Sequence, residues 1–217
     1  MSWQPPPRPD WVAAINANGV LPITAEARLP LERDALMAEA RARLGLPDGG
    51  FAGYGHPRFP VDEMLEAFDR ALAAIEGEAE LNTMGRFMTR RFLLRLLEVR
   101  LQLMAWLRTD PGVLDEEIEA PIFVAGAPRT GTTLLHALLA VDPERRAPLG
   151  WELLRPVPPP DPDPARRAHD PRIELCEREL TLPQTVVSGL LAIHVYGASR
   201  PKECLSAMSF AFRSEEL

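Results

Sequence analysis

A loop between two apolar segments carries the residues whose types and spacing could do chemistry. It runs from Gly126 to Thr133 with the sequence GAPRTGTT, and an apolar run at 121–125 precedes it. If that run is a strand and a helix begins at Thr132, the loop presents unpaired backbone N–H groups at the positive end of a helix dipole. Such an arrangement binds phosphate or sulfate. Gly126 and Gly131 permit positive φ and close approach of a ligand to the backbone, and the threonine hydroxyls can donate hydrogen bonds.

The position of the cationic side chain separates two classes of ligand. In the nucleoside-triphosphate P-loop, GxxxxG is followed by Lys and then by Ser or Thr. Here GxxxxG is present, but Thr132 stands at the Lys position and the cation is Arg129, inside the loop. A guanidinium there suits a smaller anion held by two parallel hydrogen bonds. A degenerate P-loop kinase or NTPase is the alternative, handicapped by the missing Lys and by the lack of a clear Mg²⁺ carboxylate.

The segment PRTGTT at 128–133, with its preceding strand and the following LLHALL, resembles the 5′-phosphosulfate loop of sulfotransferases that use 3′-phosphoadenylyl sulfate (PAPS). The similarity is greatest to the bacterial branch, with some to tyrosylprotein sulfotransferases. It is strong over 121–155, which includes DPERRAPLGWE, and weaker to the end through RPKEC at 200–204. The helical leader before 118 is also similar to that branch. The resemblance implies transfer of a sulfuryl group from PAPS as co-substrate, without a metal, to the hydroxyl or amine of a small-molecule acceptor.

The resemblance also implies roles for single residues. Arg129 would be catalytic, because it would contact the bridging oxygen and the transferring sulfonate. Glu152 would be the second catalytic residue, a carboxylate that removes the acceptor proton; the other interpretation is a surface carboxylate or helix cap beside Trp151. The residues from Thr130 onward would hold the 5′-phosphate. The whole nucleotide-binding set is Pro128, Arg129, Thr130, Gly131, Thr132 and Thr133.

The family's second nucleotide half-site is not recognisable in the sequence. That half-site holds the 3′-phosphate with an Arg and a Ser on a later strand and helix, and no convincing counterpart precedes Leu217. Besides the sulfotransferase and the degenerate P-loop NTPase, a third hypothesis therefore remains. It is that the chain is an N-terminal portion of a sulfotransferase, or a non-catalytic sulfotransferase-like chain. On either form of it, this chain alone could be inactive.

The elements around the loop divide the chain into two expected parts. Apolar spacing predicts helices over 31–44 and 61–76, and a long one from Asn82 or Thr83 to about Arg108. Residues 1–118 are therefore expected to form a helical N-terminal region, a cap or a dimerisation surface through which a homodimer could form. Residues 119–217 are expected to form a sulfotransferase-like P-loop α/β domain, cut short.

The expected fold class is thus α/β, with a P-loop-like parallel sheet, incomplete, preceded by the α-helical region. A strand at 121–125 and a helix at 132–140 form its first βα unit. The helix is expected to turn Leu134, Leu135, Leu138 and Leu139 inward. A Pro-rich linker follows at 156–164, and helices are predicted near 171–181, 183–193 and 201–212. No second strand of comparable clarity is present in the pattern.

Composition excludes several classes of function. The net charge is −7 and the pI is near 5.2, which argues against a nucleic-acid surface. No apolar run approaches the roughly 20 residues needed to span a bilayer, and the N-terminus has no apolar signal core, so neither membrane insertion nor export is expected. Cys176 and Cys204 are too few for a disulfide framework and are expected to be reduced thiols. A cytoplasmic protein is the expectation that follows.

Overall fold

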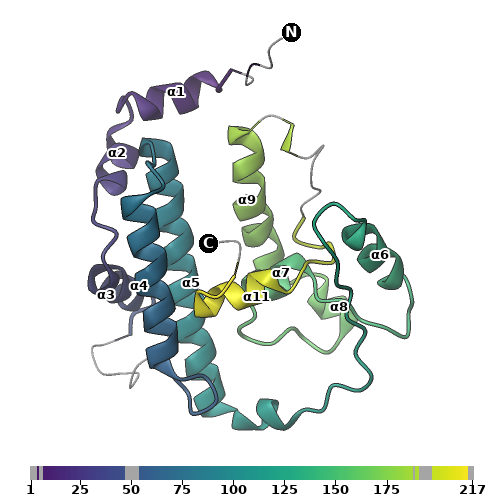
Figure 1. The fold of residues 1–217 in the computed structure, drawn as a ribbon. Coiled ribbons are helices and arrows are strands. Elements are labelled where there is room, and N and C mark those ends of the chain that lie inside the picture. The colour runs from purple at the N-terminus through teal and green to yellow at the C-terminus, as the bar shows by residue number, and fades with distance from the viewer. Residues whose placement is uncertain (1–3, 5–6, 47–53, 188, 191–196, 215–217) are drawn as a thin grey trace.

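The computed structural model describes residues 4, 7–46, 54–187, 189–190 and 197–214, and it consists of helices joined by loops (Figure 1). The longest helices, α4 and α5, stand beside each other in the N-terminal half (Figure 1). The helices of the first half are α1 (Asp10–Asn16), α2 (Leu21–Ala27), α3 (Arg33–Arg43), α4 (Val61–Gly77), α5 (Thr83–Thr109) and the 3₁₀ turn η1 (Pro111–Asp115). Those of the second half are α6 (Thr132–Leu139), α7 (Gly150–Leu154), α8 (Pro164–Arg167), α9 (Pro171–Val186), α11 (Leu205–Met208) and η2 (Ser209–Ala211).

Helix α5 is the centre of the N-terminal region. The side-chain oxygen of Asn82 caps it by accepting a hydrogen bond from the Gly85 amide at 2.8 Å. Helices α1, α2 and α3 all contact it. Leu36 of α3, Phe68 of α4 and Leu97 of α5 share one core cluster and are each 0% exposed. The three helices predicted in this region from apolar spacing are thereby confirmed as α3, α4 and α5.

Two arginines interrupt the apolar surface of α5 and are nevertheless buried. Arg90 donates to the Pro30 carbonyl at 2.9 Å and pairs with Glu39. Arg100 donates to the carbonyl of Tyr54 at 3.0 Å and to that of Phe59 at 3.3 Å, and its burial lowers its pKa. These guanidinium groups bind the loops around α5 to the helix, because a buried carbonyl needs a hydrogen-bond donor.

A second, smaller core forms where α7 packs on α9. Trp151 and Cys176 are buried together with Leu154 and Ala198. The side chain of Asp170 caps α9 by accepting from the Arg172 amide at 2.9 Å, and the Arg172 guanidinium lies 4.7 Å from the centre of the Trp151 ring. The prediction of a helix near 171–181 is confirmed, although α9 continues through Pro183 to Val186.

The other two helices predicted in the C-terminal half are only partly found in the structure. The segment predicted near 183–193 begins as the end of α9, and most of its remainder lies outside the described residues. The helix predicted at 201–212 is shorter, since only α11 and the turn η2 form between Leu205 and Ala211.

The predicted parallel sheet is wrong for this structure. In the part of the chain that is described, 121–125 has no strand assignment, and β pairing is limited to the isolated bridges His56–Phe59 and Leu149–Pro201. The physical reason is the absence of a pairing partner among those residues. A single extended segment cannot satisfy its backbone groups or bury its side chains alone. Phe123 is accordingly 85% exposed.

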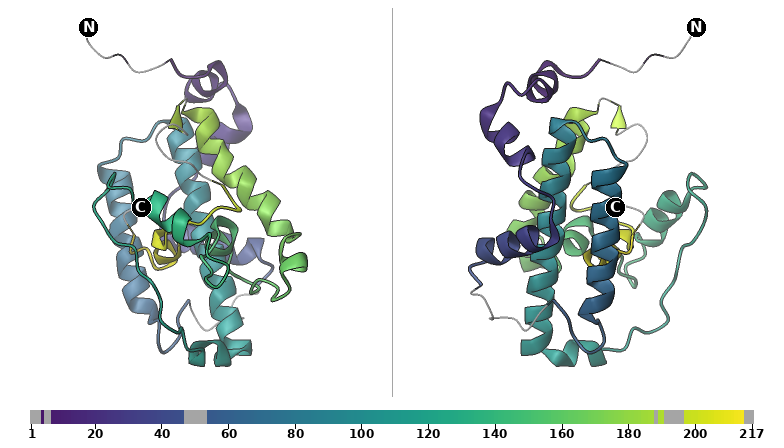
Figure 2. Two further views of the ribbon diagram at one scale, coloured as in Figure 1. Left: turned by 90° about the vertical axis from the view of Figure 1, so that its right-hand side faces the viewer. Right: turned by 60° about the vertical axis from the view of Figure 1, so that its left-hand side comes forward.

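Helix α6 forms as predicted, but its apolar residues are not turned into a core. Leu134, Leu135 and Leu138 are 67%, 50% and 61% exposed, and Leu139 is half-buried. In Figure 1 and in the right-hand view of Figure 2, α6 lies at the outer edge of the molecule, opposite α3. The inward orientation predicted for these leucines required a sheet beneath them. Over the described residues, no helix has the length and apolar character needed to cross a bilayer.

Candidate anion-binding loop

The loop between Val124 and α6 is compact and stabilised from within. The Thr130 hydroxyl donates to the Ala127 carbonyl at 2.6 Å. Gly126 lies directly against the two threonines that follow, because a Cβ at that position would meet Thr130 Oγ1 and Thr132 Cγ2, each at 2.9 Å. A larger residue at 126 would force these two threonine side chains to move. The positive φ expected at Gly126 is not found, and what the structure shows there is this close contact with two threonine side chains.

The backbone takes left-handed conformations at two positions of the loop. Gly131, the N-cap of α6, has φ 92°, and Arg129 has φ 66°. Glycine adopts this region freely, whereas a non-glycine residue there is uncommon and carries a cost of about 1 kcal/mol or more. A bend of this kind turns the chain directly into the helix. It also leaves Arg129 exposed on the loop rather than within a core.

The loop lies at the start of a helix that can bind an anion. Helix α6 begins at Thr132, and its first backbone hydrogen bond back to the N-cap is from the Leu135 amide to the Gly131 carbonyl at 3.0 Å. The amides before Leu135 have no intrahelical acceptor. Residues 125–131 are all exposed, so a ligand can reach this end of the helix. The site predicted from the sequence is therefore an accessible helix N-terminus with one arginine beside it.

The side chain of Glu152 makes its hydrogen bonds to residues outside the loop. Its Oε2 accepts from the Leu149 amide at 2.9 Å, and its Oε1 accepts from Arg146 Nη2 at 2.5 Å. The side chain is only 6% exposed, on the first turn of α7. Oε2 thus caps the start of that helix, which is the arrangement that the cap interpretation expected, and Oε1 pairs with an arginine of the connection before it.

A carboxylate that the sequence did not single out does reach the loop. The Thr133 hydroxyl donates to Glu203 Oε1 at 3.2 Å across 70 positions of sequence. Glu203 had been noted only as part of the RPKEC similarity, and spacing gives no sign of this contact. This contact depends on the tertiary structure, because it forms only when two segments far apart in sequence pair with each other.

That pairing joins 148–151 to 198–202. The Gly150 amide donates to the Arg200 carbonyl at 2.9 Å, and the Lys202 amide donates to the Pro148 carbonyl at 3.0 Å. Gly150 is needed for the close approach, because a Cβ there would come within 2.6 Å of the Gly197 carbonyl oxygen. The backbones of the two segments therefore lie so close together that residue 150 cannot carry a side chain.

The two cysteines are both free, as expected, and differ in environment. Cys204 is exposed next to Glu203, whereas Cys176 is buried against Trp151. Burial first, and the charge of Glu179 second, raise the pKa of the Cys176 thiol to about 11. A thiol held neutral in this way is a packing residue rather than a nucleophile. Across the residues that the structure describes, no group of three or more His, Cys, Asp or Glu side chains could hold a metal ion.

Comparison with known proteins identifies the segment that carries the loop. Residues 121–217 match the model of the sulfotransferase family. Over 38 residues, which are 18% of this chain and 10% of the relative, the chain is 55% identical to omega-hydroxy-beta-dihydromenaquinone-9 sulfotransferase Stf3 of Mycobacterium bovis and of Mycobacterium tuberculosis.

Two solved structures extend the similarity to most of the chain. Sulfotransferase STF1 of Mycobacterium tuberculosis superposes with a TM-score of 0.67 and 30% identity, covering 85% of this chain and 48% of that one. Sulfotransferase STF9 of Mycobacterium avium gives a TM-score of 0.67 and 25% identity, covering 87% of this chain and 46% of that one. The chain thus spans just under half the length of these relatives. Coverage of 85% includes much of the helical region, so the similarity of the leader before 118 is confirmed. The segment 121–217 therefore matches the sulfotransferase family, and the relatives it is similar to are bacterial, as the loop sequence indicated.

Proposed function

We propose that this chain provides the 5′-phosphosulfate half of a PAPS-dependent sulfotransferase site, in a protein that transfers a sulfuryl group to a hydroxyl or amine acceptor. The observation that carries the proposal is the compact loop 126–131, which leads into the exposed start of α6 within the segment that matches the sulfotransferase family.

The residues of the loop fit a phosphate in three respects. The missing Cβ of Gly126 lets the loop close on Thr130 and Thr132. The positive φ of Gly131 turns the chain so that the first amides of α6 follow at once. A phosphate at this end of the helix is stabilised by those amides and by the helix dipole.

Each group of the loop has a defined task in the proposed transfer. PAPS, when bound, supplies an activated sulfuryl group on its 5′-phosphate. The S–O bond to that phosphate breaks, a bond from sulfur to the acceptor oxygen or nitrogen forms, and adenosine 3′,5′-bisphosphate leaves. Arg129 stabilises the negative charge that collects on the bridging oxygen. Thr130, Gly131, Thr132 and Thr133 hold the phosphate in place, so that the reacting atoms are aligned.

The acceptor proton must leave to a base, and the family resemblance proposes Glu152 for this task. Its two contacts, to the Leu149 amide and to Arg146, instead support a structural role at the start of α7. Glu152→Gln separates the two roles. A base would lose transfer rate with nucleotide affinity unchanged, whereas a cap would lower the unfolding midpoint. A variant with full transfer rate would exclude Glu152 as the base.

The principal test is removal of the loop arginine. In a protein with measurable transfer, Arg129→Ala is expected to slow the reaction by about 10²–10³-fold, the scale for loss of one charge-stabilising donor. The matched control is Arg145→Ala, which removes an exposed arginine that pairs with Asp142 outside the loop. Equal rates for Arg129→Ala and the unsubstituted protein would refute the role of Arg129.

Nucleotide choice tests the proposal against the degenerate P-loop NTPase. Calorimetry with adenosine 3′,5′-bisphosphate and with ATP–Mg²⁺ compares the two ligands on the same chain. The sulfotransferase proposal expects tighter binding of the bisphosphate with no need for Mg²⁺. Tighter, Mg²⁺-dependent binding of ATP would favour the NTPase, because a triphosphate site relies on the metal to neutralise its charge.

A further inference from the structure

The contact between Thr133 and Glu203 places a carboxylate at the same hydroxyl that the proposed function assigns to the nucleotide phosphate. The Thr133 hydroxyl donates to Glu203 Oε1 at 3.2 Å. A threonine hydroxyl has one hydrogen to donate. While Glu203 accepts that hydrogen, a phosphate oxygen cannot accept it, so the two acceptors exclude each other at this atom.

Glu203 is held there by the backbone pairing that precedes it. The Leu149–Pro201 bridge and the hydrogen bond from the Lys202 amide to the Pro148 carbonyl fix the chain one residue before Glu203. At the other end of the paired segment, the Ala198 amide donates to Glu177 Oε2 at 2.6 Å. The segment that carries this carboxylate is therefore held in place by backbone hydrogen bonds on the side of α6.

Electrostatics adds to the competition for the hydrogen. Thr133 is the second residue of α6, so the Glu203 charge lies in the first turn of the helix, where a negative charge is favourable. It offsets part of the positive potential that attracts a ligand anion. A phosphate dianion arriving at the same turn is repelled by the carboxylate that it must displace.

We propose that Glu203 sets the affinity of the loop for the nucleotide, acting through the Thr133 hydroxyl. The inference rests on the proposed function, since it names the residue that regulates the same site. Glu203 occupies the hydroxyl in the free protein and releases it when the 5′-phosphate binds. It is a positioning residue, because it acts on the nucleotide by way of Thr133 and by its charge.

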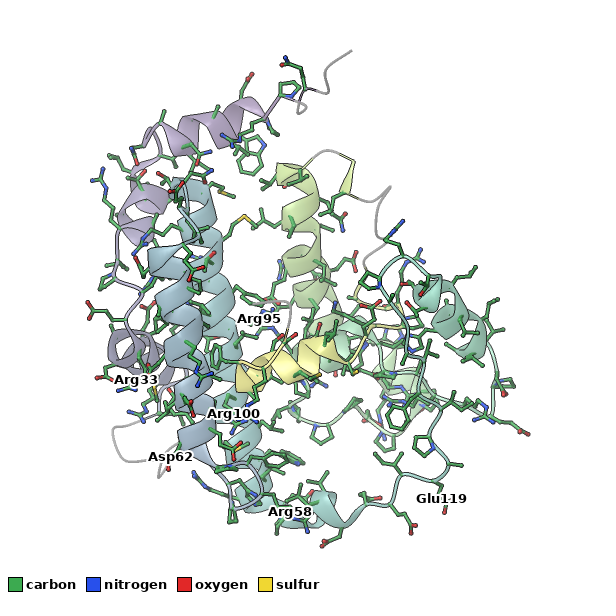
Figure 3. The ribbon with its side chains drawn as sticks, in the orientation of Figure 1. Arg33, Arg58, Asp62, Arg95, Arg100 and Glu119 are labelled. Carbon is green, nitrogen blue, oxygen red and sulfur yellow. The ribbon has the colours of Figure 1, made fainter. Side chains whose placement is uncertain are left out.

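The test measures the affinity for adenosine 3′,5′-bisphosphate by calorimetry. Glu203→Gln keeps an oxygen acceptor but removes the charge, and we expect it to tighten binding about two- to fivefold, the order expected when one partly exposed charge interaction is removed. The matched control is Glu119→Gln, which makes the same change in net charge on the connecting segment before the loop, where Figure 3 labels Glu119, and should leave affinity unchanged.

A double-mutant cycle shows whether Glu203 acts through the hydroxyl. Thr133→Ser keeps the hydroxyl, so the tightening by Glu203→Gln should persist in that background. Thr133→Val removes the hydroxyl, so the part of the tightening that comes from a weaker acceptor at that hydroxyl should disappear there, and only the part that comes from the lost charge should remain. Equal tightening in both backgrounds would mean that Glu203 acts by its charge alone. A thermal unfolding curve for each variant shows that the chain is folded.

The outcomes distinguish the two proposals. If the unsubstituted chain binds the nucleotide, Arg129→Ala weakens that binding, and Glu203→Gln changes nothing or weakens it, the inference about Glu203 is overturned and the proposed function stands. An unsubstituted chain that fails to bind adenosine 3′,5′-bisphosphate overturns both.

Discussion

Helices α5 and α6 are similar in sequence character and opposite in environment. Both are rich in leucine, yet Leu93 and Leu97 of α5 are 0% exposed while Leu134 and Leu138 of α6 are 67% and 61% exposed. Helix α5 has α1, α2 and α3 packed against it. Helix α6 forms on local grounds, from its N-cap glycine and its leucine-rich turn, without such neighbours in the described chain. Apolar periodicity therefore predicts that a helix forms, but burial depends on what the rest of the chain supplies.

The largest expected effect is on the buried side of this comparison. Leu97→Ala should destabilise the protein by about 2–5 kcal/mol, because it leaves a cavity in a core to which α3, α4, α5 and the C-terminal turn all contribute. Chemical denaturation followed by helical circular dichroism measures the change in the free energy of unfolding. A loss below about 0.5 kcal/mol would mean that the core around α5 is not packed as described.

An intermediate effect is expected in the loop that precedes α6. Gly126→Ala brings a methyl group to 2.9 Å from Thr130 Oγ1 and from Thr132 Cγ2, so the side chains of these two phosphate-binding threonines must shift. Affinity for adenosine 3′,5′-bisphosphate should fall about tenfold, which corresponds to about 1.4 kcal/mol. The loop is exposed, so the free energy of unfolding should change little. Unchanged affinity would show that the ligand does not use the closed form of the loop.

The smallest effect is expected on the exposed face of α6. Leu138→Ala removes a side chain that is 61% exposed, and the free energy of unfolding should change by about 0.5 kcal/mol or less. Because Leu97→Ala and Leu138→Ala make the same chemical change, the two variants together test the difference in burial between α5 and α6 directly. A loss comparable to that of Leu97→Ala would mean that the α6 leucines are covered in solution.

The sequence predicted local features better than tertiary ones. The start of α5 at Asn82, the turn at Gly131 and the helix after it depend on a few neighbouring residues, and all three were recognisable. The predicted sheet was wrong, because strand pairing depends on segments remote from 121–125. The resemblance identified the family mainly from the contiguous segment 121–155, because the residues of the phosphate-binding loop are neighbours in sequence.

The candidate site divides in the same way. Gly126 and Arg129 lie in the loop where the sequence placed them. Glu203 was missed because its contact with Thr133 depends on the backbone pairing of 148–151 with 198–202. The alternative of Glu152 as a helix cap could be stated from its position beside Trp151, but the ion pair with Arg146 could not.

The connection between η1 and α6 has a practical consequence for handling this protein. From Glu116 to Gly131 the chain has no helix or strand and is exposed at every position but Val124. Exposed, irregular backbone is where proteases cut first. Glu116, Glu117 and Glu119 lie together in this stretch, so a glutamate-specific protease should nick the chain there before it attacks the helices. Whether the two pieces then separate depends on the strength of the packing between the C-terminal segment and helices α4 and α5. In that packing the rings of Phe212 and Phe68 stack with their centres 4.2 Å apart.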